Sequence, residues 1–301
     1  MALGILFRKL KWIDEPFAMG MNKFVFKVAL PVLLFEDLST VAFDKVWDFK
    51  FAAFCFLITL ACIVLLILAA ILFVKKEDRG EFVQGAYRSS VAILGIAFIK
   101  NIYDDSGMAP LMIVATVPLY NVAAVMVLAL MNPSVGKIDR KALKKAMVGV
   151  ITNPIIWGIV LGVIFSAVSN RFSFEMPVIL SKVIHNVAVL ATPLGLISMG
   201  ASFEGKKALA KIRVTAVCSF IKLFGLAAIG LTIAYFMGFR DKEMVAILTM
   251  LGSSTTVSSY IMSKNMGSEG TLSASVVMVT TLFSAVSLTM WLYLLRVMNL
   301  I

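Results

Sequence analysis

The 301-residue sequence is poor in the residues that build metal sites, disulfides and acid–base catalysts, since it has three cysteines and one histidine. Cys55, Cys62 and Cys218 lie inside apolar runs without the spacing of metal ligands, so neither a disulfide framework nor a zinc site is indicated. GxSxG, HExxH, Walker and dinucleotide-binding patterns do not occur. The sequence therefore indicates neither an enzyme nor a bound cofactor.

Charged residues are also scarce, at 15% of the chain, whereas hydrophobic residues make up 60%. Soluble domains contain about 45–50% apolar residues, and here apolar runs long enough to cross a bilayer recur along the whole chain. The net charge is +11, but Lys and Arg lie in short connections, where membrane orientation and contact with anionic lipid explain them. The composition predicts an all-α, multi-pass membrane protein in contact with membrane lipid, and it gives no indication of nucleic-acid binding.

Spans of about 20 residues predict nine membrane helices. They lie near 22–40, 49–74, 82–103, 109–131, 146–168, 176–203, 211–238, 242–265 and 271–298. The apolar fragment 1–7 is too short to span, and it is not a signal peptide because its charges follow the apolar run.

Three pairs of segments recur in the same order. LGILF (3–7) resembles LGVIF (161–165), and ALPVLLFEDLS (29–39) resembles ATPLGLISMGAS (191–202). RSSVAILGIAFIKN (88–101) and GSSTTVSSYIMSKN (252–265) both contain Ser-Ser, nine residues and Lys-Asn. Offsets of 158 to 164 residues predict two copies of a five-helix unit. We assign residues 1–131 and 146–301 to the two copies, with a cytoplasmic connection at 132–145.

The repeat also predicts a tenth helix. LGVIF closes a helix in the second copy, so the first copy is expected to lack the front of its first helix. We count the incomplete N-terminal helix as helix one. Lys and Arg, with Arg88 counted among them, then concentrate in the connections after helices one, three, five and seven. Those connections are predicted to be cytoplasmic, which leaves both termini outside. Because five is odd, the second copy enters from the opposite side, as in transporters with inverted repeats.

In such transporters the solute binds near the bilayer midplane, between discontinuous helices. Hydroxyl side chains can bond to backbone groups freed by a helix break, although small polar residues also allow tight helix packing. Ser263, nearer the end of its predicted helix, is expected to tolerate a larger side chain. The candidate substrate-binding residues are Ser89, Ser90, Gly95, Ser253, Ser254, Thr255 and Thr256.

Four ionisable residues inside predicted helices are candidates for ion coupling or charge pairing. Lys222 could hold a substrate carboxylate, pair with an acid from another helix, or extend its stem toward the cytoplasmic side. Glu36 and Asp37 are either solvated at the interface or linked to protons. His185 is either a hydrogen-bonded structural residue or a titrating group suited to coupling.

Five segments resemble a known family, the auxin efflux carriers, and the resemblance covers all predicted spans. They are PVLLF (31–35), YRSSVAILGIA (87–97), NPIIWGIVLG (153–162), TPLGLISMGASF (192–203) and SSTTVSSYIMSKNMG (253–267). The resemblance implies ten helices in two inverted repeats, with helices four and nine broken where they cross. Two positions depart from the family pattern, because Ser90 and Ser254 stand where the family often has Asn and Pro.

The resemblance also implies the function. It predicts a secondary active transporter in the bacterial cytoplasmic (inner) membrane that moves a small organic anion, either a carboxylate or an auxin-like weak acid. By resemblance, helices three to five and eight to ten would move against helices one, two, six and seven. An anion channel and a transporter-like sensor are the alternatives. The coupling ion, H⁺ or Na⁺, and a homodimeric state are left open.

Overall fold

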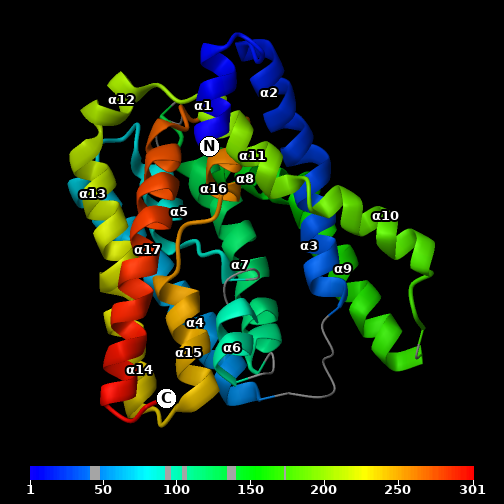
Figure 1. Cartoon of the computed structure of the whole chain (residues 1–301), viewed down its shortest axis with the longest axis vertical. Coiled ribbons are helices and arrows are strands. Elements are labelled where there is room, and N and C mark those ends of the chain that lie inside the picture. The colour runs from blue at the N-terminus through cyan, green and yellow to red at the C-terminus, as the bar shows by residue number, and fades with distance from the viewer. Residues whose placement is uncertain (41–47, 92–95, 104–106, 134–139, 173) are drawn as a thin grey trace.

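The computed structural model describes residues 1–40, 48–91, 96–103, 107–133, 140–172 and 174–301, and within these ranges every regular element is helical (Figure 1). Seven helical segments in the described part are long and apolar enough to cross a membrane. They are Glu15–Ser39, Phe49–Phe73, Ala109–Leu130, Pro154–Phe172, Val178–Ala201, Ile212–Phe236 and Thr271–Val297. The prediction of an all-α, multi-pass membrane protein is confirmed.

Three of these segments change helical geometry along their length. The first contains α2 (Glu15–Phe24), a π-helical turn η1 (Val25–Ala29) and α3 (Leu30–Ser39). The fifth contains α10 (Val178–Ala188) and α11 (Ala191–Ala201), and the sixth contains α13 (Ile212–Phe220), η3 (Ile221–Gly225) and α14 (Leu226–Phe236). Pro31 follows the π-helical turn η1, and Pro193 lies in the first turn of α11. Proline has no amide hydrogen to donate within a helix, so each proline coincides with a change of helical geometry.

The other four segments run as single helices. These are α4 (Phe49–Phe73), α7 (Ala109–Leu130), α9 (Pro154–Phe172) and α17 (Thr271–Val297). The side chain of Asp48 caps the start of α4 by accepting a hydrogen bond from the Phe51 amide at 3.0 Å. The long apolar run that follows allows α4 to continue without interruption.

Two further predicted spans are broken into half-helices. The first consists of α5 (Arg79–Tyr87) and α6 (Ile96–Tyr103), and the second of α15 (Asp241–Gly252) and α16 (Ser258–Asn265). The chain becomes extended at Arg88 and at Ser253, directly after α5 and α15. Three of these half-helices, α5, α15 and α16, are largely buried, and α15 is buried from Met244 to Gly252, whereas in α6 only Ile99 is buried.

Two helix pairs pack with their backbones in close contact. Helix α1 (Ala2–Lys9) lies against α11, and α9 lies against α3. A Cβ atom added to Gly4 would collide with the carbonyl oxygen of Ile197, and one added to Gly162 would collide with that of Phe35. Only glycine permits this approach at either position.

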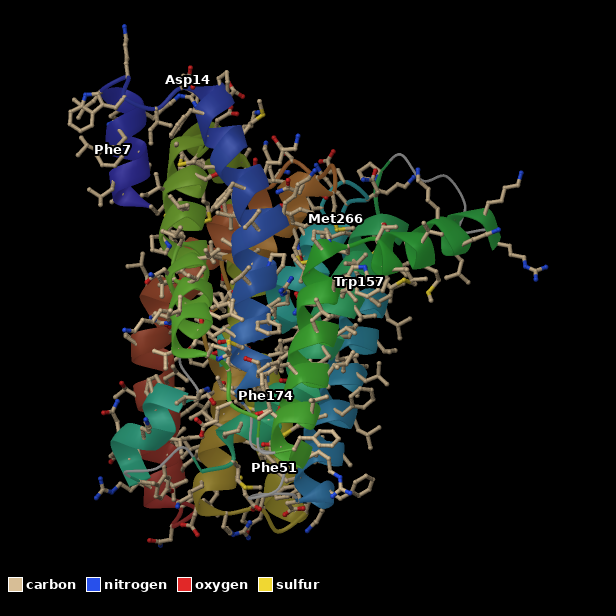
Figure 2. All side chains as sticks on the ribbon, turned by 90° about the vertical axis from the view of Figure 1, so that its right-hand side faces the viewer. Phe7, Asp14, Phe51, Trp157, Phe174 and Met266 are labelled. Atoms are coloured by element: carbon tan, nitrogen blue, oxygen red, sulfur yellow. The ribbon has the colours of Figure 1, made fainter. Side chains whose placement is uncertain are left out.

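The predicted helix at 146–168 is wrong in its boundaries. A separate helix α8 (Arg140–Ile151) precedes α9, which begins at Pro154 and continues to Phe172. The side chain of Asn153 accepts a hydrogen bond from the Ile155 amide at 2.9 Å, which starts a new helix. Figure 2 shows α8 leaving the side of the bundle near Trp157. A short helix α12 (Gly205–Ala210) connects α11 to α13.

Candidate functional site

The two broken spans touch each other at their breaks. The amide of Ser90, after α5, donates a hydrogen bond to the carbonyl oxygen of Ser254, after α15, at 3.0 Å. These residues occupy equivalent positions in the two Ser-Ser segments of the sequence. Ser253 and Ser254 are 0% and 6% exposed. The contact therefore lies inside the protein and joins segments that are far apart along the chain.

Hydroxyl groups at each break bond to the backbone of the opposite span. The Ser89 hydroxyl donates to the carbonyl oxygen of Met250 in α15, and the Thr255 hydroxyl donates to that of Gly85 in α5 at 2.7 Å. The Thr255 amide donates to the Thr280 hydroxyl in α17 at 3.1 Å. The hydroxyls thus satisfy backbone groups that the breaks leave without helical partners.

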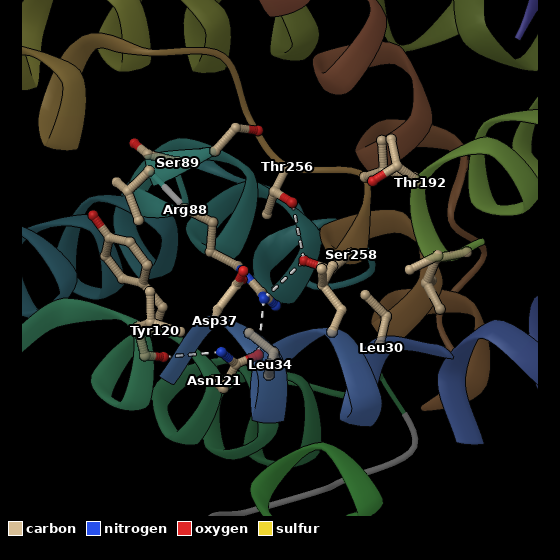
Figure 3. A pocket seen from close by; sticks show the side chains of 17 residues that line it. Leu30, Leu34, Asp37, Arg88, Ser89, Tyr120, Asn121, Thr192, Thr256 and Ser258 are labelled. Atoms are coloured by element: carbon tan, nitrogen blue, oxygen red, sulfur yellow. Dashed lines mark hydrogen bonds between the residues drawn. The ribbon is translucent and has the colours of Figure 1, made fainter. Parts of the chain in front are cut away.

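A cavity of about 100 Å³ lies beside this contact (Figure 3). Its polar lining residues are Asp37, Arg88, Ser89, Ser90, Tyr120, Asn121, Thr192, Thr256 and Ser258. Three of the predicted substrate-binding residues, Ser89, Ser90 and Thr256, line the cavity, whereas Gly95 lies outside the described residues.

Arg88 supplies a positive charge at this cavity, and its position differs from the one predicted from the sequence. We counted it with a cytoplasmic connection, but its side chain is 3% exposed and lines the cavity. Its Nη2 donates to the amide oxygen of Asn121 and to the hydroxyl of Ser258, each at 2.9 Å, and its Nη1 contacts the Met262 sulfur at 2.7 Å. The buried Nε has no hydrogen-bond partner. In the described part of the chain, no carboxylate lies within salt-bridge distance of Arg88.

Neighbouring helices complete the cavity wall. Tyr120 of α7 donates from its hydroxyl to the Met250 carbonyl oxygen at 3.1 Å, and the Tyr87 hydroxyl donates to the Tyr120 carbonyl oxygen at 2.9 Å. Asp37 reaches the cavity from α3 on the other side, as Figure 3 shows. The cavity therefore lies between helices of the broken-span region and the α2–α3 segment.

Lys222 lies on the turn η3 and is 0% exposed. Its ammonium group donates to the carbonyl oxygens of Tyr87 and Leu251 at 3.3 and 3.1 Å, and to the Ser89 hydroxyl. The interpretation that its stem extends to the cytoplasmic side is wrong, because the whole side chain is buried. Lys222 forms no ion pair among the described residues.

The remaining charged candidates lie outside the cavity. Nδ1 of His185 in α10 lies 2.9 Å from the Glu36 carboxylate in α3, and the two side chains are 61% and 25% exposed. Two of the predicted coupling residues thus contact each other on neighbouring helices. Among the described residues, no group of three or more His, Cys, Asp or Glu is arranged to hold a metal ion.

A cluster of ion pairs joins three connections outside the spans. The Lys211 ammonium lies 2.8 Å from Asp78 and 2.7 Å from Glu269. Burial opposes the charge on Lys211, but its hydrogen bonds to the two carboxylates outweigh that effect and raise its pKa. The hydrogen bond from Lys211 lowers the pKa of Glu269 below its ordinary value of 4.5. The cluster links the starts of α5 and α13 to the turn after α16.

Three residues of the site, Arg88, Tyr120 and Asn121, were not predicted from the sequence. Arg88 had a usable signal, because a charged residue inside a predicted span is costly and frequently functional. Tyr120 and Asn121 lie in a continuous apolar helix and carried no such signal.

A cavity with polar side chains between broken helices is an arrangement typical of membrane transporters. Comparison with protein families agrees, since the profile of the family described as membrane transport protein matches residues 1–292. The chain therefore belongs to this family, which is the membrane transport or auxin efflux carrier family. A comparison with curated proteins gives no match.

Proposed function

We propose that the protein is a secondary active transporter that moves a small organic anion across the bacterial cytoplasmic membrane by alternating access. The observation that carries this proposal is Arg88, a buried guanidinium on a cavity, with no carboxylate in salt-bridge distance among the described residues. A buried charge without a counter-charge is unfavourable. An anionic solute would supply that counter-charge each time it binds.

Apart from Asp37, the polar lining groups suit a carboxylate. A guanidinium binds carboxylates through two parallel hydrogen bonds, and the free Nε of Arg88 provides a donor for such a contact. The Ser258 and Thr256 hydroxyls, 3.2 Å apart, lie on the same cavity and offer further hydrogen bonds. The cavity of about 100 Å³ has room for a short-chain carboxylate.

The packing of the outer helices supports alternating access. Gly162 follows Gly4 by 158 residues and Ile197 follows Phe35 by 162, the same offsets as the repeated sequence segments. The contact of Gly4 with Ile197 therefore has a reciprocal counterpart in that of Gly162 with Phe35. Two copies of one unit, 1–131 and 146–301, inserted in opposite directions would produce such reciprocal pairs. In the proposed ten-helix arrangement, α5–α6 and α15–α16 are the broken helices four and nine.

Uptake into proteoliposomes tests the proposal. Radiolabelled acetate, lactate and succinate should be offered to the purified protein, and flux of at least one should saturate and show counterflow. Arg88→Gln should reduce that flux at least tenfold, because charge-assisted hydrogen bonds contribute about 1.5–3 kcal/mol each and about 1.4 kcal/mol corresponds to a factor of ten. Arg88→Lys should retain partial flux with a raised KM, since it keeps the charge but not the planar fork.

Arg171→Gln is the matched control, because Arg171 is an exposed arginine at the end of α9. It should transport like the wild type. Flux that rises without saturation would favour an anion channel, and binding without flux would favour a sensor. Wild-type flux in Arg88→Gln would contradict the assignment of the site.

A further inference from the structure

The ammonium of Lys222 lies between the ends of two half-helices. Tyr87 is the last residue of α5, and Leu251 is the last but one of α15. The final carbonyl groups of a helix have no partner within it, and each helix C-terminus carries a partial charge of about −0.5. Two such ends meet at Lys222, which donates to a carbonyl oxygen of each.

The third acceptor connects Lys222 to the cavity. The Ser89 hydroxyl accepts a hydrogen bond from Lys222 and donates its own hydrogen to the Met250 carbonyl oxygen. Ser89 also lines the cavity. An ammonium group has three N–H donors, and each donor of Lys222 therefore has one oxygen acceptor.

Capping of carbonyl groups alone does not explain a lysine at this position inside a membrane protein. Burial of an ionised amine is unfavourable unless the surroundings compensate the charge, and a neutral donor such as Ser or Asn could cap the same carbonyls. In the described chain the compensation comes from two helix ends and one hydroxyl, and no carboxylate lies within salt-bridge distance. A set of carbonyl and hydroxyl oxygens around one positive charge is also the chemistry that binds a Na⁺ ion at broken helices.

We propose that Lys222 is a tethered cation that takes the place of a mobile coupling cation at the crossing of the two broken spans. This inference rests on the proposed function and adds that anion flux does not require Na⁺. Lys222 acts as a positioning residue, because it holds the ends of α5 and α15 together through Tyr87, Ser89 and Leu251. Removal of the ammonium should leave a site that accepts a small free cation.

Thermal unfolding in detergent tests the cation site without any anion. Lys222→Ala should unfold at a lower temperature than the wild type, and Na⁺ or methylammonium should raise that temperature, whereas choline should not. Lys222→Met fills the space without a charge, so neither cation should stabilise it. The wild type should not respond to any of the three. Ser219→Ala, which removes a buried hydroxyl without a hydrogen-bond partner on the same helical segment, is the matched control.

Flux measurements complete the test. Wild-type flux should be unchanged when choline replaces Na⁺, and Lys222→Ala should lose at least tenfold in choline and recover part of the loss in Na⁺ or methylammonium. A Na⁺ requirement in the wild type, or a Lys222→Ala protein that responds to neither cation, would overturn the inference. The unfolding experiment decides it even if no offered anion is transported, whereas the Arg88 variants test the proposed function separately.

Discussion

At the scale of single residues, Asn121 decides how much of the Arg88 charge is available to a solute. Its amide oxygen accepts from Arg88 at 2.9 Å, and its amide nitrogen donates to the Val117 carbonyl oxygen at 2.9 Å. Asn121→Asp should place a carboxylate beside the guanidinium and form an internal ion pair. We expect the KM for the transported anion to rise at least tenfold while the unfolding temperature stays close to that of the wild type.

Concentration-dependent uptake and thermal unfolding are the two measurements for Asn121→Asp. Asn170→Asp, which adds a negative charge on α9, controls for charge alone and should leave the KM unchanged. An unaltered KM in Asn121→Asp would mean that the anion does not bind at Arg88.

Some residues of the site could be predicted from the sequence and others could not. Ser90 and Ser254 could be predicted to occupy equivalent places because hydroxyls clustered at the same position of two repeated segments. Arg88 directly precedes the first of those clusters, but counting basic residues near span ends assigns such an arginine to a connection. Asn121 could not be found, because it is one polar residue in a long apolar helix and only the three-dimensional packing brings it to Arg88.

At the scale of elements, the contact between the two breaks has a buried residue, Ser254, on one side and a partly buried residue that lines the cavity, Ser90, on the other. Ser90 and Ser254 are joined through backbone atoms at 3.0 Å, and Ser254 is 6% exposed. Ser90→Leu and Ser254→Leu should each abolish transport, because the larger side chain fills the cavity at Ser90 and overpacks the buried contact at Ser254, at a cost of about 1–3 kcal/mol. Anion uptake at matched expression, with gel filtration in detergent to confirm a monodisperse protein, measures the effect.

Thr289→Leu is the matched control for these variants, since Thr289 is an exposed residue on α17. Full transport by both crossing variants would show that the breaks do not form the solute pathway. The burial of Ser263 speaks against the expectation that this position tolerates a larger side chain. Ser263 is 0% exposed and its hydroxyl contacts Gln84 and the Ser273 hydroxyl, so its place near a helix end in the sequence did not indicate its burial.

Element boundaries were predictable where hydropathy changes sharply and not elsewhere. The predicted helix 49–74 agrees with α4 to within a residue, because polar residues flank its apolar run. The predicted helix 146–168 merged parts of α8 and α9, since the apolar run continues across Thr152 and Asn153. A local hydrogen bond from the Ile155 amide to Asn153, not a change in hydropathy, separates those helices.

At the scale of the whole molecule, the orientation in the membrane remains a prediction from charge. Lys141 and Lys207 lie in connections predicted to be cytoplasmic, and Glu175 lies in one predicted to be outside. In intact cells, an impermeant thiol reagent should label Glu175→Cys but neither Lys141→Cys nor Lys207→Cys. Labelling of all three after the cells are opened would confirm that each site is accessible.

The native cysteines make this experiment simple to interpret. Cys55, Cys62 and Cys218 are free thiols and all three are buried, so the unmodified protein provides a background with little labelling. Labelling of Lys141→Cys in intact cells would reverse the predicted orientation of both repeats and place the termini in the cytoplasm.

The π-helical turn at Ile221–Gly225 bears on how this protein could have acquired its buried lysine. A π-turn closes over five residues where an α-turn closes over four, so it holds one extra residue within an otherwise α-helical segment. Each residue of an α-helix turns the chain by about 100°, and loss of one codon here would rotate the following helix against the preceding one by about that angle. A single-codon insertion in an ancestral gene is therefore sufficient to set α14 in its present orientation relative to α13, with Lys222 on the turn between them, and an in-frame deletion of Phe224 would reverse that event.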